Sequence, residues 1–337
     1  MSYQLRTERR KRTLSDWPNV IITIAVGLAC WGVGYYHSIG YPLVVNGVVL
    51  PFWETVCVWS IPRMIIYILG LIFIVLVAFV IQRISDIERL IEERTRLAFL
   101  FFFLLMSTQT GLPALSATTI VLMCLVFMLY ELFSAYQLPE ATGKLFIVSV
   151  LIGFAGLWMP QILWLVPLVW IGMYQFQALT TRSWLASLIG ILIMYWFVLA
   201  WCIWAHDYSM FTSIYASLTD FELFAILRSF RYYYIGFLVI VCLLFVAFFH
   251  IKTDAINNRV RVRLLLSFLL NMSFWVLALI SLYGRSSTDS LLAVLFLPVS
   301  MLMAYFFESM HKRIQFMLYY FVLSLSVLSF LFRIWNF

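Results

Sequence analysis

The stretch Arg63–Arg83, RMIIYILGLIFIVLVAFVIQR, decides what kind of fold this chain forms. Between its two arginines runs a segment of almost unbroken apolar residues. A helix needs about 20 mainly apolar residues to cross the hydrocarbon core of a bilayer, and this segment has that length. The stretch therefore predicts a helix that spans a membrane, with Arg63 on one side and Arg83 on the other.

The rest of the chain has the same character. Of its 337 residues, 64% are of the types AVILMFWYC and 11% are charged, and the mean hydropathy is +1.01. Soluble domains have roughly 25% charged residues, so too few charges exist here to coat a water-soluble body of this size. The apolar excess also excludes a disordered chain. The composition predicts a protein that crosses the membrane many times.

Further apolar runs predict eleven spans in one integral membrane domain, residues 1–337. Two short runs, 145–159 and 161–178, meet at Met159-Pro160-Gln161, where proline disfavours a continuous helix. We expect a pair of short helices there, within an all-α transmembrane bundle. The expected spans are 19–40, 63–83, 97–112, 115–134, 145–159, 161–178, 184–205, 231–251, 262–283, 290–308 and 314–335.

The basic residues set the expected orientation, because cytoplasmic loops carry the excess of Lys and Arg. With the amino end inside, 17 of the 22 basic residues fall on the cytoplasmic side, five of them in the basic tail 1–18. The predicted topology therefore has the amino end inside and the carboxyl end outside. This topology also accounts for the net charge of +7, so no nucleic-acid partner is expected.

Three segments outside the spans carry structural signals. In the first outer loop, 41–62, Asn46-Gly47 between Val-rich flanks favours a small β-hairpin, although an irregular loop on the headgroups is the alternative. Residues 84–94 are amphipathic, which predicts an inner interfacial helix or an inner extension of the neighbouring spans, with a solvated charged face. The long outer loop 206–230 has apolar residues at helical spacing, which predicts one or two helices that roof the outer face.

Titratable residues gather on the outer side, whereas the centres of the spans are almost free of them. A carboxylate or histidine there could serve as a general base, and arginine could hold a lipid-linked phosphate. Helix capping and ion pairing are the alternative roles for such residues. The catalytic candidates are Glu54, His206 and Asp207, and the substrate-binding candidates are His37, Arg63, Arg228 and Arg231.

The sequence predicts no metal site and no other cofactor, because it contains no phosphate-binding glycine loop, nucleophile elbow or Cys/His metal spacing. The five cysteines are scattered. Only Cys57 and Cys202 fall near the outer surface, where they could form a disulfide or remain free thiols.

Residues Gly143 to Pro160, followed by Trp164, Pro167, Trp170 and the segment Thr181 to Gly190, resemble an uncharacterised family of bacterial multi-pass inner-membrane proteins. The same glycine-rich pair of short helices is similar to the transmembrane core of the GT-C glycosyltransferases. That resemblance implies a location in the bacterial inner membrane and a polyprenyl-phosphate-linked sugar as substrate. It also implies an acid soon after span 1, whereas the first-loop carboxylate here, Glu54, lies far along the loop.

Three functions are consistent with the sequence. The first is a GT-C-like protein that handles a polyprenyl-linked glycan at the outer face. The second is a non-catalytic scaffold or accessory subunit of an envelope complex, whose spans pack against a membrane-protein partner. The third is small-molecule transport, which would need a polar path to the midplane near the Met159-Pro160 break. All three imply contact with membrane lipids.

Overall fold

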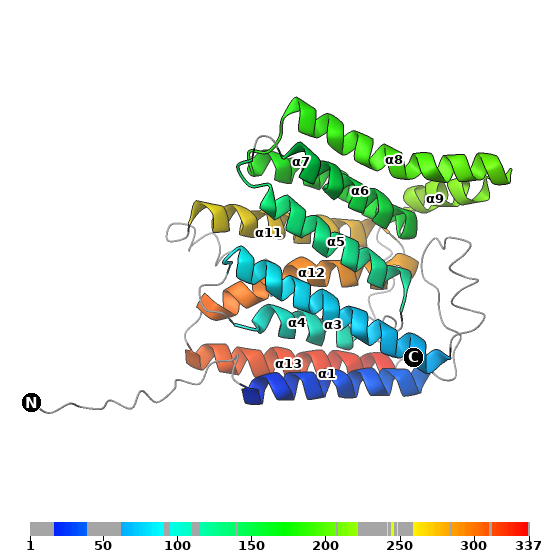
Figure 1. Cartoon of the computed structure of the whole chain (residues 1–337). Helices are drawn as coiled ribbons and strands as arrows, with labels where there is room; N and C mark the ends of the chain where they lie inside the picture. Colours follow the sequence, from blue (N-terminus) through cyan, green and yellow to red (C-terminus); the bar gives the residue numbers. More distant parts are fainter. Residues whose placement is uncertain are drawn as a thin grey trace, which may run out of the picture.

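The computed structural model describes residues 17–38, 62–90, 95–109, 115–138, 141–206, 208–221, 259–283, 285–309 and 312–335, together with residues 241, 244, 245 and 248. In this part of the chain the regular elements are helices that lie side by side along one common direction (Figure 1). Phe221 and Tyr283 form an isolated antiparallel bridge. The helices are α1 (Trp17–Ser38), α3 (Arg63–Ile87), α4 (Leu97–Ser107), α5 (Ala117–Ser134), α6 (Thr142–Trp158), the 3₁₀ helix η1 (Pro160–Leu165), α7 (Val166–Gln175), α8 (Thr181–Ala205), α9 (Ser209–Thr219), α11 (Val260–Leu282), α12 (Arg285–Ser309) and α13 (Lys312–Trp335).

Seven of the described helices are long and apolar enough to cross a membrane: α1, α3, α5, α8, α11, α12 and α13. This confirms the predicted all-α membrane architecture. Helices α4, α6 and α7 are shorter, at 11, 17 and 10 residues. The count of eleven spans stays a prediction, because most of the predicted span 231–251 lies outside the described residues. The expected hairpin in the loop 41–62 lies outside them as well.

Helix α4 is shorter than the predicted span 97–112, since it ends at Ser107. Just after it, the Thr108 hydroxyl donates to the Leu105 carbonyl and the Gln109 amide to the Met106 carbonyl, which satisfies two carbonyl groups of the last turn. Eleven residues rise only about 16 Å, roughly half the thickness of a bilayer core. By Leu115 the chain has nevertheless reached the start of α3, because the Leu115 amide donates to the Ile66 carbonyl.

The predicted break at Met159-Pro160 is confirmed. Met159 has an extended backbone, with φ −144° and ψ 91°, and Pro160 begins η1. Gln161 donates from Nε2 to the hydroxyl of Ser287, near the start of α12. The break therefore lies at one end of the bundle and does not reach its middle.

The core forms around α12 and α4. The membrane-length window of α12 is 100% buried inside the protein, and almost every residue of α4 is buried. Phe101 of α4 packs on Phe307 of α12, with ring centroids 4.9 Å apart. The corresponding windows of α13, α8 and α1 are only 17%, 22% and 28% buried. These three helices form the flanks of the bundle, with α8 on one side and α1 and α13 on the other (Figure 1).

Contacts between distant segments define two ends of the bundle. At one end Arg96 lies over the ring of Trp17, and Gln137 donates its amide to the Phe176 carbonyl. At the other end Thr118 bonds Ser290. We call the first the basic end, because it holds eight of the nine Lys and Arg side chains that the structure describes; the ninth, Arg63, lies at the opposite end. The eight are Arg83, Arg89, Arg96, Lys144, Arg182, Arg259, Arg261 and Arg263.

Candidate functional site

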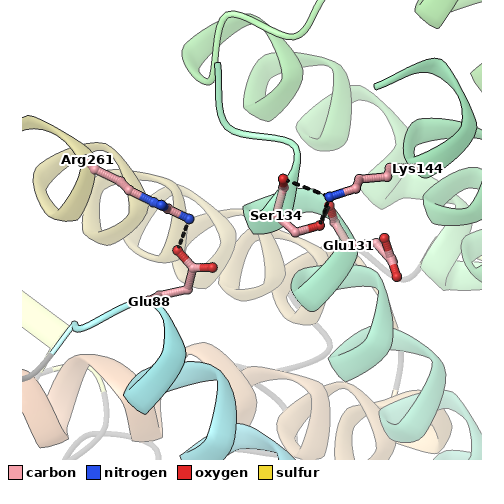
Figure 2. Close-up of polar contacts among 5 residues, drawn as sticks. All are labelled: Glu88, Glu131, Ser134, Lys144 and Arg261. Atoms are coloured by element: carbon pink, nitrogen blue, oxygen red, sulfur yellow. Dashed lines mark hydrogen bonds and ion pairs between the residues drawn. The ribbon is translucent and has the colours of Figure 1, made fainter. Parts of the chain in front are cut away.

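The basic end contains a buried ion pair between two distant helices (Figure 2). Glu88 ends α3, and its side chain is only 3% exposed. Its Oε2 lies 2.5 Å from Nη2 of Arg261, in the first turn of α11, and that side chain is 45% exposed. The Arg261 guanidinium also lies 5.4 Å from the ring centroid of Tyr136, just after α5. One arginine therefore connects three segments of the bundle.

The local backbone explains how Glu88 turns inward. The next residue, Arg89, has a left-handed conformation with φ 49°, a role that glycine usually takes at helix ends. The Leu90 amide then donates to the Ser85 carbonyl and the Arg89 amide to the Asp86 carbonyl, which is the hydrogen-bond pattern of a Schellman motif. Residues 84–87 thus continue α3, as the inner-extension alternative predicts. The expected solvated charged face is wrong for Glu88, because Arg261 stabilises this carboxylate inside the protein.

Burial and charge act in opposite directions on Glu88. Removal from water raises the pKa of this carboxyl above its ordinary value, since it disfavours the charged form. The nearby Arg261, and more weakly Lys144, lower it, but the net pKa remains raised. The Glu88 carboxyl therefore depends on the Arg261 guanidinium to stay ionised.

Lys144 closes the neighbouring turn between α5 and α6 (Figure 2). Its Nζ donates to the carbonyl and to the hydroxyl of Ser134, both at 3.0 Å, and the Ser134 hydroxyl donates to the Glu131 carbonyl. These contacts satisfy carbonyl groups at the end of α5, which have no partners within the helix. Their geometry fits a structural contact that joins α5 to α6.

Gln82 joins α3 to the start of α4. Its Nε2 donates to the Thr95 carbonyl at 2.6 Å and to the Asp86 carboxylate at 2.9 Å, and its Oε1 accepts from the Phe99 amide at 3.2 Å. Phe99 lies in the first turn of α4, whose amides have no partners within the helix. A buried side chain from one helix therefore caps the next.

Tyr283 organises the opposite end. Trp164 of η1 donates from Nε1 to the Tyr283 hydroxyl at 2.7 Å, and that hydroxyl donates to the Leu218 carbonyl of α9 at 2.8 Å. Burial and the nearby Asp220 carboxylate raise the pKa of Tyr283, although the Trp164 hydrogen bond lowers it. The phenol therefore stays protonated and keeps its donor role. Helix α9 confirms that the loop 206–230 contains a helix.

The sequence-predicted site residues are only partly described. His206 ends α8 in a left-handed conformation, φ 52°, and is exposed. His37 ends α1 and Arg63 begins α3, at neighbouring helix ends where Tyr35 and Tyr67 stack edge to face. Helices α1 and α3 lie across the bundle from α8 (Figure 1), so His37 and Arg63 share a corner that His206 does not. The other four candidates, Glu54, Asp207, Arg228 and Arg231, lie outside the described residues.

The predictions about the cysteines and about metal binding are also covered only in part by the described residues. Cys202 is a buried free thiol, and Cys57, with which it could have formed a disulfide, lies outside the described residues. In the part of the chain that the structure describes, no three His, Cys, Asp or Glu side chains come together as a metal site would require. Sequence reasoning missed the Glu88–Arg261 pair and the Trp164–Tyr283 contact. The only available signal was the position of Arg261 and Glu88 at the same predicted side of the membrane.

Seven membrane-length apolar helices place the chain in the class of helical integral membrane proteins. No family model, curated protein or solved structure matches it. The fold and the described contacts therefore carry the argument about function.

Proposed function

We propose that this chain is a protein of the bacterial inner membrane, inserted with its amino end and its basic end in the cytoplasm and its carboxyl end outside. The charge distribution of the described residues supports this orientation. Eight cations lie at one end and Arg63 at the other, and positive charge is retained on the cytoplasmic side during insertion. His206, α9 and Tyr283 then face the outside.

Cysteine labelling tests the orientation. In a background without the five native cysteines, Thr181→Cys marks the basic end and His206→Cys the opposite end, and both residues are exposed. We expect a membrane-impermeant maleimide to label His206→Cys in intact spheroplasts and Thr181→Cys only after the cells are opened. The reverse pattern would invert the topology and remove the proposed outer site.

For its role, we propose a non-catalytic scaffold or accessory subunit of a membrane complex. One observation carries this proposal: only 22% of the membrane-length window of α8 is buried inside the protein, whereas the corresponding window of α12 is 100% buried. Trp196, Phe197 and Trp201 of α8 are 67%, 64% and 57% exposed. The polar groups of the basic end, in contrast, join helices to one another. Such an arrangement fits a protein that acts through its outer helix faces.

Handling of a polyprenyl-phosphate-linked glycan at the outer face is the second candidate. The close packing of α6 on α8 through Gly153, Gly156 and Gly190 lies in the segment that resembles the GT-C core. At the opposite end, the Trp164–Tyr283–Leu218 contacts hold α9 over η1, on the side that faces outward in the proposed orientation. Glu54 or the His206-Asp207 pair would be the base, and Arg228 or Arg231 would hold the phosphate.

Photo-crosslinking and lipid analysis separate these two roles. A photo-reactive phenylalanine analogue at Phe197 is expected to give a discrete protein adduct in native membranes. The same analogue at Phe296, which is 0% exposed, is the matched control and should give none. Adducts with lipid alone at position 197, together with polyprenyl phosphate detected by mass spectrometry in the purified protein, would instead support the glycan-handling role.

A further inference from the structure

Two buried hydroxyl groups near the basic end have no hydrogen-bond partner within the described part of the chain. They belong to Ser85, in the last turn of α3, and to Thr95, just before α4. The two residues are only 1% and 7% exposed. A buried hydroxyl without a partner destabilises the folded state, so nearly all such groups in folded proteins bond to protein or to ordered water.

Ser85 differs in this respect from three buried serines of other helices. The hydroxyls of Ser107, Ser273 and Ser300 donate to carbonyl groups of their own helices, three or four residues earlier. The Ser85 hydroxyl makes no such bond, although it too lies inside a helix. It is therefore available to a group outside α3.

Gln82 brings the two residues with these hydroxyls to the same place. It lies three residues before Ser85 and so on the same face of α3. Its Nε2 donates to the Thr95 carbonyl. The Leu90 amide donates to the Ser85 carbonyl, so the chain after α3 folds back over this turn. Ser85 and Thr95 therefore lie on the inner side of the connection between α3 and α4.

The Glu88 carboxylate adds an acceptor to these two hydroxyls. Glu88 follows Ser85 by three residues, at the end of α3. Its Oε2 bonds Arg261, whereas no described residue donates to its Oε1, which points away from the guanidinium (Figure 2). An ionised carboxylate can accept about four hydrogen bonds. Most of this capacity is therefore left for a small polar molecule.

The local charge favours a neutral occupant. Arg261 and Lys144 both act on Glu88 as positive charges, so an added cation would be repelled. An added anion would meet the carboxylates of Glu88 and Asp86, the second of which bonds Gln82. Water has no charge, and it can donate to a carboxylate and accept from a hydroxyl at the same time.

We propose that the connection between α3 and α4 binds ordered water, which hydrogen-bonds the hydroxyls of Ser85 and Thr95 and Oε1 of Glu88. Three such partners are typical of a water molecule inside a protein. The water donates to Oε1, so together with Arg261 it stabilises the ionised carboxylate. This inference is independent of the orientation and of the role proposed above.

Removal of the hydroxyls tests the water site through the sign of the change in Tm. The matched control is Ser273→Ala in α11, where the buried hydroxyl bonds a carbonyl of its own helix. With water bound, Ser85→Ala removes a hydrogen bond and should lower Tm of the detergent-purified full chain by about 2 °C relative to this control. In a dry site the same substitution removes a partnerless group and should raise Tm. Thr95→Val should change Tm in the same direction as Ser85→Ala.

Radiolytic labelling in heavy-oxygen water detects the bound water directly, because hydroxyl radicals formed from it oxidise the neighbouring side chain. We expect heavy oxygen on Leu90, which is buried beside Ser85, and less of it in Ser85→Ala. Leu269, which is buried beside Ser273, is the control and should stay unlabelled. A raised Tm in Ser85→Ala, or Leu90 without label, would contradict the site. A Tm raised by Na⁺ but not by choline would show a bound cation instead of water.

Discussion

Gly190→Val is expected to prevent the close packing of α8 on α6 and to leave little correctly folded protein. A Cβ at Gly190 would lie 2.8 Å from the backbone oxygen of Phe146, 3.0 Å from Cβ of Ser149 and 3.2 Å from the amide nitrogen of Val150. Two of these atoms belong to the α6 backbone, so they can move only if the helix moves. Overpacking of this kind costs about 1–3 kcal/mol when side chains can adjust, and more when they cannot.

Size-exclusion chromatography in detergent and Tm measure this effect. Gly32→Val is the matched control, because Gly32 lies in a membrane-length helix and a Cβ there meets no atom within 4 Å. We expect the control to elute as the natural protein, Gly190→Ala to have a lowered Tm, and Gly190→Val to aggregate. A Gly190→Val protein whose Tm stays within about 2 °C of the natural value would show that α6 and α8 are not packed this closely.

The spans could be read from the sequence because lipid imposes a simple length and composition on them. Residues 63–83 are sufficient to locate α3. The helix continues beyond them to Ile87, and the left-handed conformation of Arg89 then closes it. The same criterion predicts a span as far as residue 112, whereas α4 ends at Ser107. Apolar content does not indicate where within such a run a helix ends, and here the helix stops before the polar residues Thr108 and Gln109.

The polar contacts could not be read in this way. Glu88 and Arg261 are 173 residues apart, and Trp164 and Tyr283 are 119 apart, so no local spacing indicates either contact. Taken alone, the charged segment after α3 has no partner for a buried carboxylate, so the sequence predicts a solvated face there. The sequence groups the described candidates His37, Arg63 and His206 by side of the membrane, which fixes their depth but not their position around the bundle.

Arg261→Met is expected to destabilise the protein by about 2 kcal/mol at neutral pH. Removal of one partner from a buried pair leaves an uncompensated charge, which costs about 3–5 kcal/mol when both groups are buried. We expect the smaller value because the Arg261 side chain is 45% exposed and already shares its charge with water. The variant also loses the contact with the Tyr136 ring. Thermal unfolding in one detergent at fixed protein concentration measures the difference.

The pH dependence of this loss distinguishes a charge effect from lost packing. Without Arg261 the pKa of Glu88, already raised by burial, rises further, so in the window above its ordinary pKa the folded state binds more protons than the unfolded state. Stability of Arg261→Met should therefore fall as pH rises through that window, and the difference from the natural protein should be smaller at pH 5 than at pH 8. Glu88→Gln/Arg261→Met has no charge left to bury, so it should recover most of the loss and show no such slope. An equal deficit at both pH values, unchanged in the double variant, would mean that the ion pair contributes shape and not charge.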